Sequence, residues 1–256
     1  MLRLETPMEN RLMLDTGKLL DIQLQCPETW SNKVFLTLDI DWAHDDVLEH
    51  SINLLEELEV QATWFATHET PLLDRIRSNP NFELGIHPNF NFLLECNESK
   101  GRNVDEVIER MMQIVPEATS ARSHSLVHSS RILAAFKKYG IARESNSFIP
   151  ASSTALTVQP WEVISGIVSL PFIWGDMHAA QSRDPDNPMQ SLAPDEIASR
   201  TGMKVLNFHP IHLFINTNRI DDYESTRPIH NDPGALWKER STADSGAEQF
   251  LRTLVK

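Results

Sequence analysis

The chain of 256 residues is poor in residues that several classes of protein require. Its only cysteines, Cys26 and Cys96, are too few for a disulfide framework and lack the spacing of a zinc-binding motif. Nine scattered glycines exclude a phosphate-cradling loop or a dinucleotide fingerprint, and no nucleophile elbow is present. No apolar run approaches the roughly 18–20 residues that span a bilayer, and the N-terminal stretch lacks a signal-peptide core.

Basic residues are also in deficit, since 23 Lys and Arg stand against 36 Asp and Glu and give a net charge of −13. A chain this acidic repels a phosphate backbone, so we expect neither nucleic acid nor an anionic membrane surface as a partner. The 41% hydrophobic and 23% charged residues are ordinary for a globular protein. We therefore expect a single cytoplasmic domain, residues 1–256, without membrane insertion.

Strand-like and helix-like segments alternate along most of the sequence. Apolar, β-branched runs predict strands at 33–39, 60–67, 82–87 and 121–124, and a strand or strand pair at 204–216. Helical periodicity and capping signals predict helices at 45–58, 71–78, 104–115, 129–139 and 247–255. This alternation implies right-handed crossovers and a parallel sheet covered by helices. We expect a closed or nearly closed α/β barrel with its core at 33–216, and a C-terminal helix that packs against the first strand.

Side chains with catalytic chemistry lie where these strands end, which is where α/β sheets carry their reacting groups. They are Asp39, Asp41, His87, Arg122, His124 and His209. The alternation of a strand puts Asp39 and Asp41 on one face, about 6–7 Å apart. Two such carboxylates repel, so one of them tends to bind a metal or hold a proton. The alternative is that Asp41 or Asp45 only caps the next helix.

His87 is followed by Pro88, which favours the first position of a helix. His87 would then cap that helix, and Asn91 would lie one turn later, where the two could chelate one cation. A neutral amide oxygen is a weaker zinc ligand than an imidazole. The alternative is a purely structural histidine at a strand end.

Arg122 and His124 could share a face, and a guanidinium near Asp39 would keep that carboxylate ionised and oriented. The alternative for Arg122 is a surface salt bridge. His209 ends the last strand and is the candidate general acid, whereas His212 is expected to be a supporting or core histidine.

Other candidates remain for the binding of a metal or a sugar. His44 and His178 are spare metal-ligand candidates. Trp42, Trp64 and Trp174 lie near strand ends and could stack on a sugar ring, although aromatic residues more often belong to the core.

In order and context, these residues resemble the polysaccharide deacetylase family, which is carbohydrate esterase family 4 with its NodB-homology domain. The resemblance rests on 36–41 (LTLDID) for the first motif, 62–67 (ATWFAT) for the second strand, 83–87 (ELGIH) before the His-x-x-x-His motif, Arg122 for the arginine motif and 206–209 (LNFH) for the last motif. It spans roughly residues 33–216.

The resemblance implies an irregular (β/α) barrel of about seven parallel strands. It also implies Asp39 as the general base, tethered by Arg122, and His209 as the acid that protonates the leaving amine. Asp41 and His87 would be ligands of zinc or another divalent transition metal. The second histidine of the family motif falls at Asn91, so the third ligand is either Asn91 or a substitute, for which the candidates are His124, His44 and His178.

These observations lead to a metal-dependent hydrolase that removes an N-acyl (acetyl) group from a sugar or related amide. The His-Pro-Asn and His-Pro-Ile-His forms of the motifs resemble the WbmS-type subgroup, which is associated with bacterial surface-polysaccharide (O-antigen) synthesis. That resemblance implies an N-acylated sugar or a sugar-linked precursor as the partner. One alternative is a catalytically inactive carbohydrate-binding protein on the same barrel. Another is a glycosidase with paired carboxylates, although Asp39 and Asp41 lie on one strand rather than across a cleft.

Overall fold

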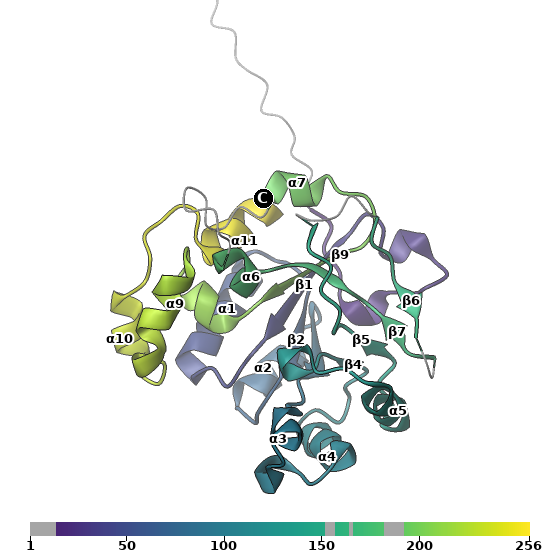
Figure 1. The fold of residues 1–256 in the computed structure, drawn as a ribbon. Helices are drawn as coiled ribbons and strands as arrows, with labels where there is room; N and C mark the ends of the chain where they lie inside the picture. Colours follow the sequence, from purple (N-terminus) through teal and green to yellow (C-terminus); the bar gives the residue numbers. More distant parts are fainter. Residues whose placement is uncertain (1–13, 152–156, 164–165, 182–191) are drawn as a thin grey trace, which may run out of the picture.

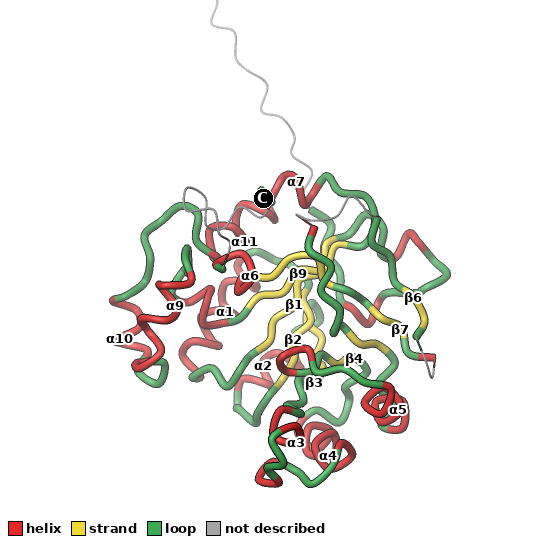
Figure 2. The backbone as a smooth tube through the Cα atoms, in the orientation of Figure 1, coloured by secondary structure: helices red, strands yellow, loops and turns green. Residues whose placement is uncertain are grey.

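The computed structural model describes residues 14–151, 157–163, 166–181 and 192–256 (Figures 1 and 2). The strands are β1 (Val34–Asp39), β2 (Ala62–Ala66), β3 (Phe82–Ile86), β4 (Ser120–Ala121), β5 (Arg143–Glu144), β6 (Trp161–Glu162), β7 (Val168–Ser169), β8 (Phe172–Gly175) and β9 (Lys204–Phe208). The helices are α1 (Asp45–Glu57), α2 (Leu72–Ser78), α3 (Asn91–Leu94), α4 (Val104–Ile114), α5 (Ser130–Lys138), α6 (Asp176–Ala180), α7 (Pro194–Ala198), α8 (Pro210–Phe214), α9 (Ile220–Thr226), α10 (Pro233–Lys238) and α11 (Ala247–Val255). Short 3₁₀ turns are η1 (Leu19–Asp21), η2 (Pro27–Thr29), η3 (Glu98–Lys100), η4 (His124–Leu126) and η7 (Arg227–Ile229).

The strands form one curled sheet in the order β6-β7-β5-β4-β3-β2-β1-β9-β8, with the helices around it (Figure 1). Every pair is parallel except β6–β7. Backbone bonds from Phe172 to Ser147 and from Ile149 to Phe172 join the stretch after β5 to the start of β8, so the two sides of the sheet meet. With β7 and β8 counted as one interrupted strand, and the antiparallel strand β6 set aside, seven strands ring the described barrel. The predicted barrel is confirmed.

The central strands are buried along their whole length, because helices cover the sheet and each strand has a neighbour on both sides. One close approach depends on glycine. A Cβ atom on Gly85 of β3 would lie 2.7 Å from the carbonyl oxygen of Ser120 and 2.8 Å from the ring of Phe65. Only glycine therefore lets β3 pack this closely against its neighbours.

The segment that precedes β1 covers the amino ends of the strands. The backbone of Leu19 donates a hydrogen bond to Thr63, and that of Leu20 donates one to the carboxylate of Glu83. Glu83 is buried, and burial raises its pKa against the opposing effect of hydrogen bonds from Ser120 and Thr63. With this end of the barrel filled, the carboxyl ends of the strands remain for the site.

The predicted strand at 204–216 is only half correct. Strand β9 ends at Phe208, and α8 begins at Pro210, with His209 as the residue that precedes its first turn. Proline suits the first position of a helix because its missing N–H would have had no partner there.

The predicted C-terminal helix is found at Ala247–Val255 as α11. It packs mainly against α7 and α8 rather than against the first strand. The ring of Phe250 stacks on Trp174 of β8 with centroids 4.3 Å apart.

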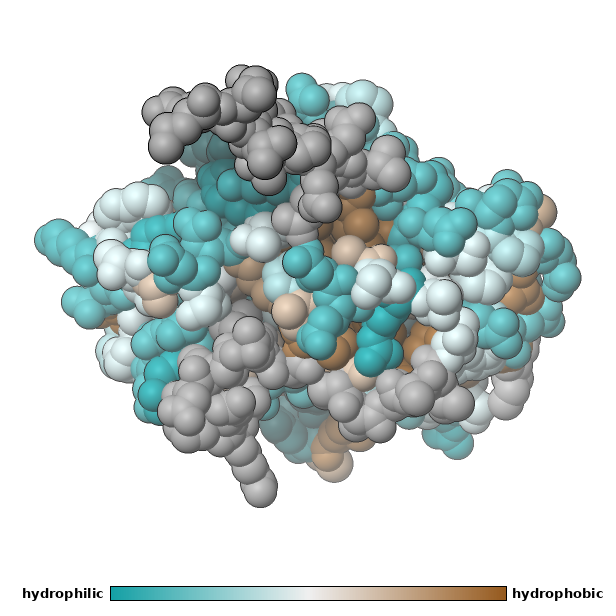
Figure 3. Space-filling view, turned by 90° about the horizontal axis from the view of Figure 1, so that it is seen from above, coloured by the Kyte–Doolittle hydropathy of each residue, from teal (hydrophilic) through white to brown (hydrophobic). Residues whose placement is uncertain are grey.

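On the face seen in Figure 3, hydrophilic residues predominate among the coloured atoms, and hydrophobic residues show as patches between them. Within the described residues, no helix is both long enough and apolar enough to cross a bilayer. Cys26 and Cys96 are both free and do not pair with each other.

Candidate active site

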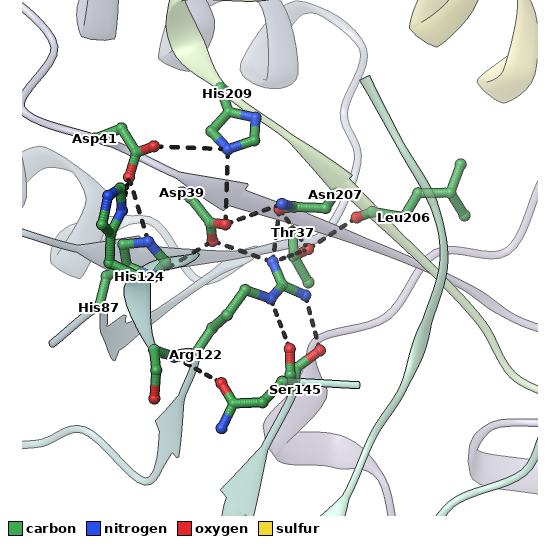
Figure 4. Close-up of polar contacts among 12 residues, drawn as sticks. Thr37, Asp39, Asp41, His87, Arg122, His124, Ser145, Leu206, Asn207 and His209 are labelled. Atoms are coloured by element: carbon green, nitrogen blue, oxygen red, sulfur yellow. Dashed lines mark hydrogen bonds and ion pairs between the residues drawn. The ribbon is translucent and has the colours of Figure 1, made fainter. Parts of the chain in front are cut away.

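The connections after β1, β3, β4 and β9 converge at the carboxyl end of the barrel (Figure 4). They bring five of the six predicted strand-end side chains to the wall of one cavity of about 340 Å³: Asp39, Asp41, His87, His124 and His209. Because parallel strands end at the same edge of a sheet, residues far apart in sequence meet here. Arg122, the sixth, lies behind this wall.

Arg122 directly follows β4 and is completely buried, which excludes the alternative of a surface salt bridge. Its Nη1 donates to Oδ1 of Asp39 at 3.1 Å, and Nδ2 of Asn207 donates to Oδ2 of the same carboxylate at 2.9 Å. The rings of Phe65 and Phe172 lie 4.8 Å and 4.9 Å from the guanidinium carbon. Asp39 is therefore held by one cation and one amide.

The guanidinium of Arg122 has four further hydrogen bonds. It donates to Thr37 Oγ1 at 2.8 Å, to Asn207 Oδ1 at 2.6 Å, and to the carbonyl oxygen and Oγ of Ser145 at 2.8 and 2.7 Å. These acceptors satisfy a charge that would be costly to bury unpaired. The side chain of Arg122 thus links β1, β9 and the residue after β5.

A second group at the cavity consists of Asp41, His87 and His124 (Figure 4). Oδ1 of Asp41 lies 3.2 Å from Nε2 of His87 and 3.4 Å from Nδ1 of His124, yet it forms no hydrogen bond of good geometry in the described structure. Burial alone would raise the pKa of Asp41, but the interactions with His124 and His87 outweigh it and hold this pKa well below its ordinary value.

Such a group fits a divalent transition metal. One potential ligand atom from each residue lies within 4.8 Å of the others, and two imidazoles with one carboxylate are a donor set that zinc uses. A buried carboxylate oxygen without a hydrogen-bond partner is expensive, and a cation facing it would satisfy it.

His209 lies beside both carboxylates. Its Nε2 is 3.8 Å from Oδ2 of Asp39 and 3.7 Å from Oδ2 of Asp41. Its Nδ1 lies 2.7 Å from Oδ1 of Asp176, and its backbone N–H donates to Oδ2 of Asp176 at 2.6 Å. Burial lowers the pKa of His209, but the charge and hydrogen bond of Asp176, with smaller effects of Asp41 and Asp39, raise it to about 10. His209 is therefore protonated at neutral pH, and its Nε2–H faces the cavity.

Sequence reasoning missed Asp176. It lies directly after β8, is 1% exposed and meets the ring of His209 at Nδ1, while Nε2 of that ring faces the cavity. A signal was present, because the apolar run 170–174 ends in Gly-Asp much as the first strand ends in Asp39. The role of Asn207 was also missed, although it lies inside the last motif.

Asn91 does not lie where we expected. Residues 87–90 are not helical, Phe90 is the residue that precedes α3, and Asn91 begins that helix. The prediction that His87 caps a helix with Asn91 one turn later is therefore wrong, because Pro88 does not start a helix here. The side-chain amide of Asn91 donates to Oγ of Ser125 at 3.0 Å.

Three further histidines considered in the sequence analysis lie outside the group of Asp41, His87 and His124. Nδ1 of His44 accepts the backbone N–H of Asp46 and caps α1. His178 lines the same cavity of about 340 Å³, and its ring lies 4.2 Å from that of Phe148. His212 is buried, its Nδ1 lies 2.8 Å from Oγ1 of Thr217, and burial lowers its pKa to about 4. His212 is thus a neutral buried histidine, as expected.

Of the three tryptophans considered for stacking on a sugar, Trp64 and Trp174 are core residues with at most 2% exposure, which is the more common alternative that the sequence analysis gave. Trp42 is 47% exposed, and its ring meets that of His124 edge-on at 5.0 Å. Trp42 and His87 also line a neighbouring, mainly apolar cavity of about 500 Å³ next to α4.

A buried strand that ends at Asp39 with Asp41 in the turn after it, a histidine after β3, a buried arginine after β4 and a histidine after β9 form the arrangement that the resemblance to deacetylase-type barrels led us to expect. Residues 36–227 match the WbmS-like polysaccharide deacetylase family. The chain belongs to the polysaccharide deacetylase family.

A crystal structure from Bordetella bronchiseptica, assigned as a polysaccharide deacetylase involved in O-antigen biosynthesis, is 39% identical, covers 94% of this chain and 97% of its own, and has a TM-score of 0.82. A crystal structure from Mycobacterium smegmatis, also assigned as a polysaccharide deacetylase, is 15% identical over 77% of this chain and 82% of its own, with a TM-score of 0.48. The family 4 carbohydrate esterase from Streptomyces lividans is 12% identical over 82% and 87%, with a TM-score of 0.43. Among proteins of curated function, none matches this sequence.

Proposed function

We propose that the protein is a metal-dependent hydrolase that removes an acyl group, acetyl in the simplest case, from the nitrogen of a sugar or a related amide. One observation carries this proposal. A protonated imidazole, an oriented carboxylate and a group of three potential metal ligands all face the same cavity of about 340 Å³. Acyl transfer to water needs a base, an acid and an electrophile within reach of one carbonyl group.

Asp41, His87 and His124 would hold zinc or another divalent transition metal. We assign the third ligand to His124 rather than to Asn91. Nδ1 of His124 lies within the group, whereas the side-chain amide of Asn91 donates to Ser125. A metal bound there supplies Lewis-acid chemistry, since it polarises the acyl carbonyl group and lowers the pKa of a water molecule.

The remaining steps belong to side chains. Asp39 would accept a proton from the attacking water, and the hydrogen bonds from Arg122 and Asn207 to its carboxylate support this role. His209 would donate the proton on Nε2 to the leaving nitrogen, with Asp176 on Nδ1 keeping the ring charged and oriented. The proposed base therefore lies at the end of β1, and the proposed acid is the residue that follows β9.

The 39% identical relative assigned to O-antigen biosynthesis supports a proposal for the substrate class. We propose an N-acylated sugar or a sugar-linked precursor of a surface polysaccharide, handled in the cytoplasm.

The proposal is tested by elemental analysis of the purified protein, joined to an assay for acetate release from a panel of N-acetylated sugars. We expect about one divalent metal ion per chain. Asp41→Ala and His87→Ala should lose the metal, while Asp39→Asn keeps it and lowers kcat/KM by about 10²–10⁴-fold, the usual contribution of a general base.

His44→Ala is the matched control, since it removes a nearby histidine that caps α1 and lies outside the group. It should keep its metal. Full metal content in the His87→Ala variant would refute the ligand assignment. A wild-type chain that takes up neither zinc, cobalt nor nickel would favour a non-catalytic carbohydrate-binding protein.

A further inference from the structure

The turns that carry two of the proposed ligands, Asp41 and His124, both contain residues in the left-handed region of backbone conformation. Asp41 and Trp42 have φ values of 38° and 54°, and Ser125 and Leu126 have φ values of 54° and 56°. None of the four is glycine, and side chains with a Cβ atom populate this region rarely. Two consecutive such residues on each turn therefore need support from elsewhere in the fold.

Each turn is held by a polar side chain from a neighbouring connection. The backbone N–H of Trp42 donates to Oγ1 of Thr67, which follows β2, at 3.1 Å. The side-chain amide of Asn91, at the start of α3, donates to Oγ of Ser125 at 3.0 Å. Ser125 lies directly after His124, so this bond acts on the residue next to the proposed ligand.

The connection after β3 also supports the second turn through a backbone hydrogen bond. The backbone N–H of His124 donates to the carbonyl oxygen of Pro88 at 3.0 Å. The backbone N–H of Asn91 is itself held by Oδ1 of Asn89 at 2.9 Å, which fixes the start of α3. The same connection begins with His87, so it carries one proposed ligand and braces the turn of another.

We propose that Asn91 is a positioning residue that clamps Ser125 in the left-handed conformation and thereby aims Nδ1 of His124 at Asp41 and His87. The inference rests on the proposed function, because it concerns the third ligand of that site. In this arrangement Asn91 does not coordinate the metal, although it lies four residues after His87. It acts through a hydrogen bond to the turn that supplies the ligand.

A double-mutant cycle on cobalt(II) affinity tests this inference. The affinity and the visible absorption spectrum of the cobalt-loaded protein are measured for the wild type, Asn91→Ala, Ser125→Ala and the double variant. Loss of a group that orients a ligand weakens metal binding by about 10–100-fold, so each single change should lower the affinity by roughly tenfold and alter the spectrum. The double variant should lie close to the single ones, because both changes remove the same bond.

Ser125→Gly separates the clamp from a direct role of the hydroxyl. Glycine adopts positive φ freely, so this variant should bind cobalt more tightly than Ser125→Ala although both lack the hydroxyl. Asn97→Ala is the matched control. Its side chain accepts from the backbone of Ser99, away from the turn, and it should match the wild type. Thermal unfolding of each metal-free variant corrects for general loss of stability.

A large effect of Asn91→Ala with no effect of Ser125→Ala would overturn the clamp and make Asn91 a direct ligand. Independent, additive effects of the two changes would overturn it as well. Wild-type affinity in both single variants would refute the inference and leave the proposed function intact. A wild-type chain that binds no cobalt would refute the proposed function and this inference together.

Discussion

Replacement of Arg122 by methionine should cost more stability than any exposed substitution, and the structure sets the size of the effect. Arg122 donates to five acceptor atoms and is the cation next to Asp39, and both side chains are buried. Methionine fills much of the same space between Phe65 and Phe172 but leaves the carboxylate without its counter-charge. Removing one partner of a buried ion pair costs about 3–5 kcal/mol.

For a chain of this size, each kcal/mol shifts the melting temperature by about 2–4 °C, so we expect a fall of about 6–20 °C. Urea unfolding followed by circular dichroism gives the free energy directly, and the slope m should stay unchanged. Adding Asp39→Asn to Arg122→Met removes the unpaired charge and should recover at least about 1 kcal/mol.

Arg131→Met is the matched control, because Arg131 is an exposed arginine on α5, and its loss should change the stability by no more than about 0.5 kcal/mol. A loss below about 1 kcal/mol in Arg122→Met, or no recovery in the double variant, would show that the guanidinium is not the counter-charge of Asp39 in solution.

Three further changes test other parts of the structure. Asp176→Asn removes the carboxylate that raises the pKa of His209, so this pKa should fall from about 10 towards its ordinary 6.5 in an NMR titration, and the alkaline limit of activity should move to lower pH. Glu248 is ion-paired with two arginines and a histidine. Against the opposing effect of burial, these partners lower its pKa from 4.5 to about 2. The ionised carboxylate therefore stabilises the fold above pH 4.5, and this stabilisation is lost as the pH falls towards 2. In Glu248→Gln, the loss of unfolding free energy between pH 4.5 and pH 2 should therefore be smaller by roughly 1–2 kcal/mol, as measured by urea unfolding at several pH values. An unchanged pH dependence would contradict the pairing. Gly85→Ala should cost about 1–3 kcal/mol by thermal unfolding because its methyl group meets backbone and ring atoms below 3 Å, and a neutral result would mean that β3 can shift.

The barrel could be predicted from the sequence because its central strands are buried on both faces. Their continuous apolar runs and the helical stripes between them are strong signals, and β1 and α1 lie within a residue of their predicted bounds. The run at 204–216 is ambiguous because a buried strand and a short buried helix are equally apolar. Pro210 was the residue that indicated the boundary.

The strand-end residues were predictable for a topological reason, since parallel strands end at one edge. Their partners were not. Asp176 follows the short β8, and its contact with His209 depends on the pairing of β8 with β9. The position of His124 depends on the left-handed turn at Ser125, which a serine followed by a leucine gives no reason to expect.

The hydrogen bonds of Arg122 also bear on the order in which the chain folds. They join residues up to 85 positions apart, and Thr37 of β1 bonds the carbonyl oxygen of Leu206 across 169 positions. Such contacts stabilise the folded chain only after long loops have closed, and this closure is slow compared with helix formation. The cavity is therefore complete only after β9 has paired with β1, and metal uptake during refolding should lag behind the recovery of helical signal.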